Sequence, residues 1–544
     1  MNAKPLHILV VLLVTTIGDI STVFSREHLI GSQAPLSEVV RAARVAINIT
    51  DELVIRDPFP SALFGFNINY ASFQEELWDP GTQSLKSGVV DYLTPFTGAL
   101  YRYPGGLIAN GFDWSQAIGP VDKRQLQQVV AVFRRPPGKV LFGIDEYLHF
   151  LTQVNGRGLY VLNLVGVDPP PPMTEADESS LAKHTRGLAK YLNTPGRPAV
   201  RIDYYELGNE LDRADYEWPH EKYIERSRAT ISAIRELDKN ARFIAFLRDF
   251  EWTYRKAPKR DADPPERLMA DVMRGLPMVD DYSLHHYYDG RHSGGACRTV
   301  PCWLDRMARS IETFKLVRDG QNPRIWVTEH ARTISKEKGG GASSVQFFST
   351  NLSSAISTAD YLIALAQIPQ VQGAVWHGLN ARPWLLFDVP PKYPVLKPTP
   401  VYWGLRVLRK IDLPVVIGTR TYSMNVSGYA GGYDVRAVGF RDHDKQALGV
   451  WVVNRASREL IAELEYTPFK GKEVSRWHFH LAGQAGIDPD TPQLSPNLVL
   501  EPKKERAQFT DSGKTTLNLP AASISTIIFR KEISPSSSPV SIGR

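Results

Sequence analysis

Two glutamates, Glu210 and Glu329, each follow a short apolar run that predicts a β-strand. A protonated carboxyl group can give a proton to a leaving oxygen, and an ionised carboxylate can act as a nucleophile. Two carboxyl groups about 5–5.5 Å apart favour double-displacement hydrolysis of a glycosidic bond. A single glutamate at a strand end more often caps a helix or forms a surface ion pair. The two are therefore informative only if one fold brings them together.

Other polar residues also lie at the ends of predicted strands. Asn209 precedes Glu210, and its amide can donate a hydrogen bond to a substrate. Arg102 ends another predicted strand, and a guanidinium beside Glu329 would keep that carboxylate ionised. A structural ion pair with any other acid is the alternative. The glycines at 105 and 106 favour a tight turn, because the Gly-Lys-Ser/Thr signature of a phosphate-binding loop is missing there.

The segment His-His-Tyr-Tyr at 285–288 ends a further predicted strand. Strand alternation places His285 and Tyr287 on one face, and His286 and Tyr288 on the other. The adjacent histidines then point apart, which argues against a metal site, and neither a metal ion nor a cofactor is expected. Trp376 ends a later strand, where it would either form the floor of a sugar subsite by stacking or pack in the core.

Eight apolar segments of strand length alternate with longer segments of helical spacing. The predicted strands are 62–67, 99–103, 158–165, 200–207, 243–247, 282–287, 324–328 and 373–376. Strands that alternate with helices predict a parallel sheet of the α/β class, and eight such units predict a (β/α)8 TIM barrel over residues 57–410. Glu210 then ends the fourth strand and Glu329 the seventh, at the edge where such barrels hold their active sites.

The pattern of apolar and turn-forming residues changes after the predicted barrel. Residues 411–532 contain short strand-like runs separated by Gly, Asp and Asn turns, which predicts a C-terminal β-sandwich domain. The strands predicted within residues 26–56 have no partner in the barrel, so we expect these N-terminal strands to complete the sandwich. The Ser- and Pro-rich residues 533–544 are expected to form a disordered tail.

Residues 1–25 are typical of a secretory signal peptide, with a lysine, a short apolar run and small residues before a cleavage site. An uncleaved anchor or a buried strand is the alternative. We expect a protein that is secreted or periplasmic, with no membrane association after cleavage. Cys297 and Cys302 are the two cysteines of the chain, and their spacing in a Gly-rich loop predicts a disulfide, with two free thiols as the alternative.

The chain has 544 residues, of which 43% are hydrophobic and 22% charged, and its formal net charge is +6. These values exclude a disordered chain, a collagen-like repeat and a polytopic membrane protein. The basic residues are not gathered into one long run, so a nucleic-acid partner is not expected. A mild positive excess is compatible with an acidic polymer as substrate. The sequence does not predict the oligomeric state.

The sequence Gly-Asn-Glu ending at Glu210, together with Glu329 on the seventh strand, resembles glycoside hydrolase clan A. The resemblance implies that Glu210 is the acid/base, that Glu329 is the nucleophile and that Asn209 contacts the sugar 2-hydroxyl. It also implies that Arg102 lies near the nucleophile. Comparison with the His-x-Tyr pattern of the clan favours His285 and Tyr287 as site residues, with the tyrosine bonded to the nucleophile.

The segment from Arg102 through Gly-Phe-Asp-Trp at 111–114 is similar to family 51 α-L-arabinofuranosidases, and the domain order also suits families 39 and 79. Family 51 enzymes carry a Glu-His pair after strand one, where this chain has Asn69, whose amide would still bond a sugar hydroxyl. The resemblance implies a secreted O-glycosyl hydrolase that retains configuration and degrades a plant or extracellular carbohydrate, with preference for arabinofuranosides. A hydrolase of acidic glycans, similar to β-glucuronidases and heparanase, and a non-catalytic carbohydrate-binding barrel are the alternatives.

Overall fold

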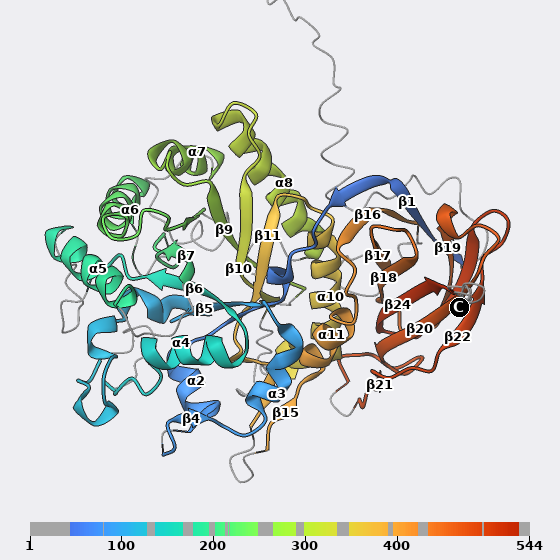
Figure 1. The fold of residues 1–544 in the computed structure, drawn as a ribbon, viewed down its shortest axis with the longest axis horizontal. Coiled ribbons are helices and arrows are strands. Elements are labelled where there is room, and N and C mark those ends of the chain that lie inside the picture. The colour runs from blue at the N-terminus through green and yellow to red at the C-terminus, as the bar shows by residue number, and fades with distance from the viewer. Residues whose placement is uncertain are drawn as a thin grey trace, which may run out of the picture.

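The computed structural model describes residues 44–79, 81–127, 137–166, 178–194, 202–212, 216, 218–247, 265–289, 299–333, 347–389, 395–422, 434–491 and 494–532. The expected signal peptide, Cys297 and the expected C-terminal tail lie outside these residues. Two bodies pack side by side, a closed barrel and a ten-stranded sheet (Figure 1). None of the helices among the described residues is both long and apolar enough to span a bilayer.

Eight parallel strands close the barrel, and each coincides with one of the predicted strands in chain order. They are β2 (Gly65–Asn67), β5 (Leu100–Tyr103), β6 (Arg157–Leu162), β7 (Ile202–Leu207), β8 (Phe243–Phe246), β9 (Asp281–Tyr288), β10 (Arg324–Arg332) and β11 (Val371–Trp376). The prediction of a TIM barrel is confirmed. Glu210 follows the fourth of these strands and Glu329 lies on the seventh, as the sequence predicts.

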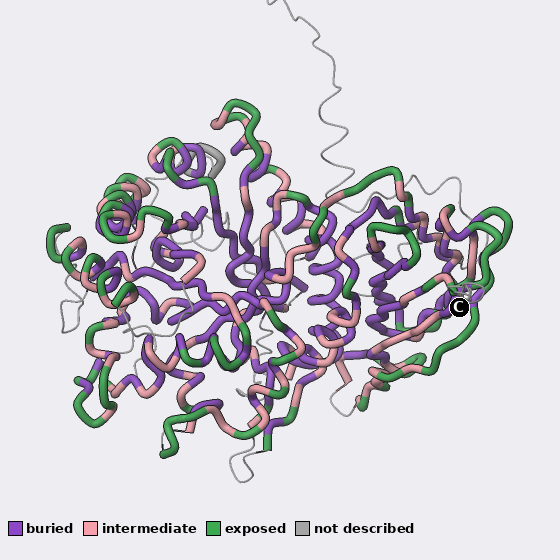
Figure 2. Tube along the Cα trace, in the orientation of Figure 1, coloured by how far each residue is buried: buried purple, intermediate pink, exposed green. Residues whose placement is uncertain are grey.

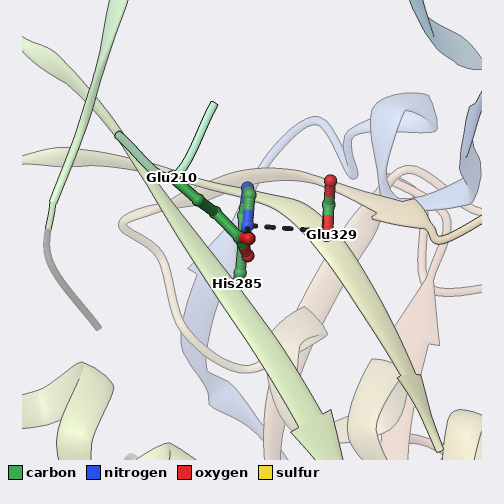
Figure 3. A group of neighbouring side chains, drawn as sticks. All are labelled: Glu210, His285 and Glu329. Carbon is green, nitrogen blue, oxygen red and sulfur yellow. Dashed lines mark hydrogen bonds and ion pairs between the residues drawn. The ribbon is translucent and has the colours of Figure 1, made fainter. Parts of the chain in front are cut away.

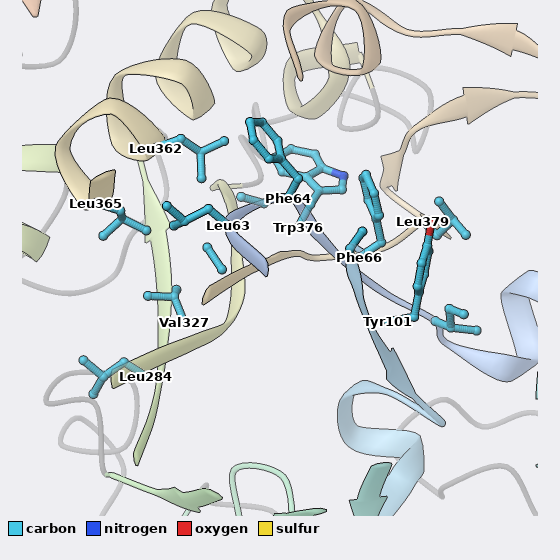
Figure 4. Packing of buried hydrophobic residues seen from close by; sticks show 14 of the residues in the cluster. Leu63, Phe64, Phe66, Tyr101, Leu284, Val327, Leu362, Leu365, Trp376 and Leu379 are labelled. Carbon is cyan, nitrogen blue, oxygen red and sulfur yellow. The ribbon is translucent and has the colours of Figure 1, made fainter. Parts of the chain in front are cut away.

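Helices surround the barrel (Figure 1), and the main ones are α2 (Tyr70–Glu76), α4 (Ile144–Gln153), α5 (Glu178–Leu192), α6 (His220–Arg235), α7 (Pro265–Gly275), α8 (Val300–Val317), α10 (Leu352–Ala366) and α11 (Pro400–Leu408). Strand alternation separates two groups of apolar side chains. Leu159, Tyr204 and Val375 belong to a small cluster formed by side chains of the barrel strands. Trp376, the next residue after Val375, belongs instead to the larger cluster between strands and helices (Figure 4).

The second body is a sheet of ten strands with the order β21-β20-β24-β18-β17-β16-β1-β19-β23, in which β22 pairs with β20. Its strands are β1 (Arg44–Arg56), β16 (Val415–Tyr422), β17 (Val435–Arg441), β18 (Ala447–Asn454), β19 (Leu460–Tyr466), β20 (Glu473–Ala482), β21 (Asn497–Val499), β22 (Glu505–Gln508), β23 (Lys514–Leu519) and β24 (Ser523–Lys531). The sheet curls around one apolar core, which confirms the predicted sandwich.

The N-terminal segment joins this sheet, as predicted, and lies between β16 and β19. It forms one strand, β1, which is antiparallel to β16 and parallel to β19. The sequence predicts two short strands here. The structure has a single strand here. Its register against β16 shifts between Thr50 and Val54, and this bulge does not interrupt the strand.

Both faces of the central strands are buried. Val415 and Ile417 of β16 point into the sandwich core, whereas Val416 between them belongs to the cluster that includes the barrel helices. Trp451 of β18 also faces the barrel side, and its indole nitrogen donates to the carbonyl of Leu408 in α11. Burial is therefore continuous where the barrel and the sheet meet (Figure 2), and the two bodies form one packed unit.

Candidate active site

Arg102, at the end of β5, organises the carboxyl edge of the barrel. Its guanidinium is fully buried, and it donates from Nη1 to Oε1 of Glu329 at 2.8 Å and from Nη2 to Oδ1 of Asn209 at 2.7 Å. Its Nε forms an ion pair with Glu206 on β7. One cation thus connects its own strand with the ends of β7 and β10, and it brings together two residues that the sequence placed at the site.

Glu329 has donors at both carboxylate oxygens. Oε1 accepts from Arg102, and Oε2 accepts from the hydroxyl of Tyr287 at 2.6 Å. Nδ1 of His377 lies 3.2 Å from the same Oε2. Burial by itself would raise the pKa of Glu329, but His285, His377 and Arg102 together hold that pKa well below its usual range. The side chain is therefore an ionised carboxylate in a dry setting, which suits a nucleophile.

Glu210 lies opposite Glu329, beyond the end of β7 (Figure 3). Its Oε1 is 2.8 Å from Nδ1 of His285, and its side chain is 17% exposed, against 4% for Glu329. Carboxylate oxygens of Glu210 and Glu329 and a nitrogen of His285 lie within 4.8 Å of one another. This proximity fits the carboxyl spacing of about 5–5.5 Å in retaining glycosidases better than the spacing of about 6.5–9.5 Å in inverting ones.

Asn209 is held so that its side-chain Nδ2 can donate to a substrate. Its Oδ1 accepts from Arg102, and its backbone N–H and carbonyl are both bonded by the side chain of Asn110. Among the described residues, the buried Nδ2 of Asn209 has no hydrogen-bond partner. A buried N–H group without a partner is costly. This arrangement therefore offers a fixed donor for an oxygen atom of a substrate.

The two histidine–tyrosine pairs of β9 separate as strand alternation requires. His285 and Tyr287 contact Glu210 and Glu329, whereas His286 on the opposite face contacts the hydroxyl of Tyr361 at 2.6 Å. Burial lowers the pKa of His286 well below the usual value, so it is a neutral core residue. Of the two registers that alternation allows, the structure has the one that the His-x-Tyr resemblance favours.

Trp376 and Asn69, both predicted for the site, each have a structural role. Trp376 is 1% exposed and packs near Phe64 and Phe66 on the outer side of the strands (Figure 4), so it is a core residue and cannot form the floor of a subsite. The reason is alternation, because Val375 points inward and its neighbour must point outward. Asn69 caps the N-terminus of α2, where its Oδ1 accepts from the N–H of Ser72.

Three residues that were not predicted from the sequence also border the site. His377 directly follows β11, and the indole of Trp384 lies 4.6 Å from its ring and 5.4 Å from that of Tyr287. Asn67, at the end of β2, accepts from Nη1 of Arg102 at 3.1 Å. Its place at a strand end is a signal that could have identified it, whereas Trp384 lies in an irregular hairpin with no periodic pattern.

Glu210, His285 and Glu329 are also close enough to be considered as ligands of a metal ion. The donor set does not suit one. Oε1 of Glu329 is 2.8 Å from a guanidinium nitrogen, and its Oε2 already accepts a hydrogen bond from the hydroxyl of Tyr287. A divalent cation bound there would face the positive charge of Arg102 at close range. The arrangement is better suited to two carboxyl groups that act on an organic substrate.

The curated relatives found by sequence comparison are named arabinofuranosidases, although no model of a protein family matches the chain. The chain is 24% identical over 242 residues to an intracellular exo-α-(1→5)-L-arabinofuranosidase of Streptomyces lividans. It is 23% identical over 252 residues to the enzyme of the same name from Acetivibrio thermocellus. The first match covers 40% of this chain and 34% of the Streptomyces enzyme, and the second covers 42% of this chain and 46% of the Acetivibrio enzyme. The chain therefore spans less than half of the length of these relatives.

The fold is shared over a longer range than the sequence. The structure of the family 51 α-L-arabinofuranosidase from Thermotoga petrophila superposes with a TM-score of 0.69 at 14% identity, and the match covers 89% of this chain and 99% of that one. The barrel and the sandwich are thus the architecture of that structure as well. In sequence and in fold, the chain is similar to family 51 α-L-arabinofuranosidases.

Proposed function

We propose that this chain, with its likeness to family 51 glycoside hydrolases, is a retaining glycosidase that cleaves O-glycosidic bonds by double displacement. The observation that carries the proposal is the pair of carboxyl groups with oxygens within 4.8 Å of each other in unlike surroundings. Arg102 and Tyr287 hold Glu329 as an anion, whereas Glu210 is more exposed and contacts the imidazole of His285. Unlike surroundings of this kind assign one carboxyl group as nucleophile and the other as acid.

Each group has a defined task in the proposed reaction. Glu329 attacks the anomeric carbon while Glu210 gives a proton to the leaving oxygen, and a covalent glycosyl-enzyme forms. Glu210 then takes a proton from water, whose oxygen displaces Glu329. The free Nδ2 of Asn209 donates to a sugar hydroxyl beside the anomeric centre. The two carboxyl groups and water account for every proton and bond in this cycle.

The substrate that we propose is an α-L-arabinofuranoside in a plant or extracellular carbohydrate. The support is the name of the relatives, which are α-L-arabinofuranosidases. A second candidate is an acidic glycan, because an amide stands at Asn69, where family 51 enzymes carry an acid, and the net charge is +6. A panel of aryl arabinofuranosides, xylosides, glucosides and glucuronides distinguishes the two.

The proposed nucleophile is tested by Glu329→Ala. We expect turnover to fall by about a thousandfold or more, as in other enzymes that lose a nucleophile. Azide should restore it by forming a glycosyl azide of inverted configuration. Glu210→Ala should instead give the azide of retained configuration, because azide then attacks the glycosyl-enzyme. Glu312→Ala, on the surface of α8, is the matched control. Unchanged activity of Glu329→Ala would show that the nucleophile is wrongly assigned.

We also propose that residues 1–25 direct secretion and that Cys297 and Cys302 then form a disulfide. The support is the apolar leader and the short cysteine spacing. Cys302 lies in the first turn of α8, and its N–H donates to Thr299. The two bacterial relatives are named as intracellular enzymes, so secretion would distinguish this chain. Alkylation of the denatured, unreduced protein is the test, since two modified cysteines would contradict the disulfide.

A further inference from the structure

His285 takes part in a hydrogen-bonded chain that continues behind the proposed acid/base. Its Nδ1 lies 2.8 Å from Oε1 of Glu210, and its Nε2 lies 3.1 Å from the hydroxyl of Thr328. That hydroxyl donates to Oε1 of Glu206 at 2.7 Å. Glu206 and Thr328 are both fully buried, and the other oxygen of Glu206 is paired with Arg102. Neither Glu206 nor Thr328 has a task in the double displacement itself.

The order of donors in this chain fixes the position of one hydrogen. A carboxylate paired with a guanidinium accepts hydrogen bonds only, so the single hydrogen of the Thr328 hydroxyl points to Glu206. The oxygen of Thr328 must then accept from His285, which requires a hydrogen on Nε2. A neutral imidazole carries one hydrogen. Nδ1 of the neutral ring is therefore a lone pair that faces Glu210.

We propose that Glu206 and Thr328 are positioning residues that hold His285 in the Nε2–H tautomer, so that its Nδ1 and the Glu210 carboxyl share one exchangeable proton. The proposal rests on the proposed role of Glu210. In the opposite tautomer, an Nδ1–H group would donate permanently to Glu210. That bond would stabilise the ionised carboxylate and weaken Glu210 as an acid.

The shared proton balances over the two halves of the reaction. In the first half, the Glu210–His285 pair gives its proton to the leaving oxygen, the glycosidic bond breaks and the bond from Glu329 to the anomeric carbon forms. In the second half, water bonds to that carbon, the bond to Glu329 breaks and the proton of water returns to the pair. His285 ends each cycle as it began.

The charges that face His285 are consistent with a shared proton. Glu210 contacts Nδ1, Glu329 lies 3.6 Å from Nδ1, Arg102 is the neighbouring cation, and the ring of Phe246 on β8 lies 5.0 Å away. Burial by itself would lower the pKa of His285. The negative charges of Glu329 and Glu210 outweigh burial and the positive charge of Arg102, so the pKa of His285 is raised.

The tautomer is tested by Thr328→Val, which keeps the shape of the side chain and removes the acceptor, with Thr328→Ser as the matched control. The readout is the ¹⁵N spectrum of histidine-labelled full-length protein at alkaline pH, assigned with His285→Gln. We expect Nε2 to be protonated in the native protein and in Thr328→Ser, and this preference to be lost in Thr328→Val. A native ring with hydrogen on Nδ1 would overturn the proposal, whether or not the protein hydrolyses glycosides.

The consequence for catalysis is tested with leaving groups of different acidity. For glycosides with poor leaving groups, we expect Thr328→Val to lower kcat/KM by about tenfold or more, a part of the roughly 10²–10⁴ that general acid catalysis supplies. The high-pH limb should also move to lower pH. Cleavage of a dinitrophenyl glycoside, which needs no proton, should change little. Equal losses on both substrates would overturn the proposal, while failure of the Glu329→Ala test would overturn the proposed function separately.

Discussion

Glu329 and Glu210 differ in the charge of their neighbours more than in their own chemistry. Glu329 accepts from Arg102 and Tyr287 and lies beside His377, whereas Glu210 contacts the ring of His285. Different surroundings of this kind allow one of two like groups to attack while the other delivers a proton. The pH dependence of the reaction should therefore respond to the neighbours of each carboxyl group.

His377→Gln should move the acidic limb of kcat/KM to higher pH. Glu329 attacks only when ionised, so activity persists on the acidic side until the pH falls through its lowered pKa. Removing His377 removes one cause of that lowering, while burial continues to raise the pKa. Initial rates across the acidic range measure the shift. His443→Gln, at an exposed residue beside Asp57, is the control, and coincident acidic limbs in both variants would contradict the expectation.

Most of the charged site could be predicted from single residues at strand ends. Arg102, Asn209, His285 and Tyr287 each end or follow a strand, and the structure brings them together around the two glutamates. The prediction for Trp376 was wrong because the last residue of a strand can face either side, and the apolar run around it does not tell which. Trp384 could not be predicted, since tertiary packing alone brings its short hairpin to the site.

At the scale of elements, the turn after β5 joins two parts of the site. Gly105 has φ +78°, and a Cβ there would lie 2.5 Å from the carbonyl oxygen of Ile68 and 2.6 Å from Oδ1 of Asn67. Glycine thus allows the turn that follows Arg102 and β5 to lie directly against the chain after β2. The Gly-Gly pair in the sequence predicted a tight turn, but the close approach to β2 depends on packing between distant segments.

Gly105→Ala should lower the free energy of unfolding by about 2–4 kcal/mol, from the left-handed backbone and the overlap together. It should also lower activity, since Asn67 contacts Arg102. Gly119→Ala is the matched control, because Gly119 has φ +72° and no atom within 4 Å of the added Cβ. Chemical denaturation of the two variants separates the cost of backbone strain from the cost of overlap. Equal destabilisation would show that the overlap relaxes at no cost.

At the scale of the molecule, buried ion pairs join the barrel to the sandwich. Arg455, after β18, pairs with Asp289 at the end of β9 and with Asp360 in α10, at 2.8 and 2.7 Å. Arg436 on β17 also pairs with Asp360. Sequence periodicity predicted both bodies and the place of the N-terminal segment. It did not predict these contacts, because the one charged residue of a helix has no marked partner in the sequence.

Arg455→Met should destabilise the protein by about 3–5 kcal/mol, because it removes the cation paired with the buried Asp289 and leaves Asp360 with Arg436 as its remaining cation. Arg186→Met is the control, since that arginine forms an exposed pair with Glu236 and should cause no measurable change. Thermal or chemical unfolding measures both. A loss for Arg455→Met no larger than for the control would show that the buried charges are compensated in another way.

The place of β1 has a consequence for the order in which the protein is made. Its partners β16 and β19 begin at Val415 and Leu460, about 360 and 400 residues after β1 ends at Arg56. At about 5–20 residues per second, the ribosome reaches them roughly 20–80 s later. During that time the barrel can close, but β1 has no sheet to enter. The nascent chain must therefore keep the apolar face of β1 (Val45, Ile47 and Ile49) uncovered until the last quarter of the protein emerges.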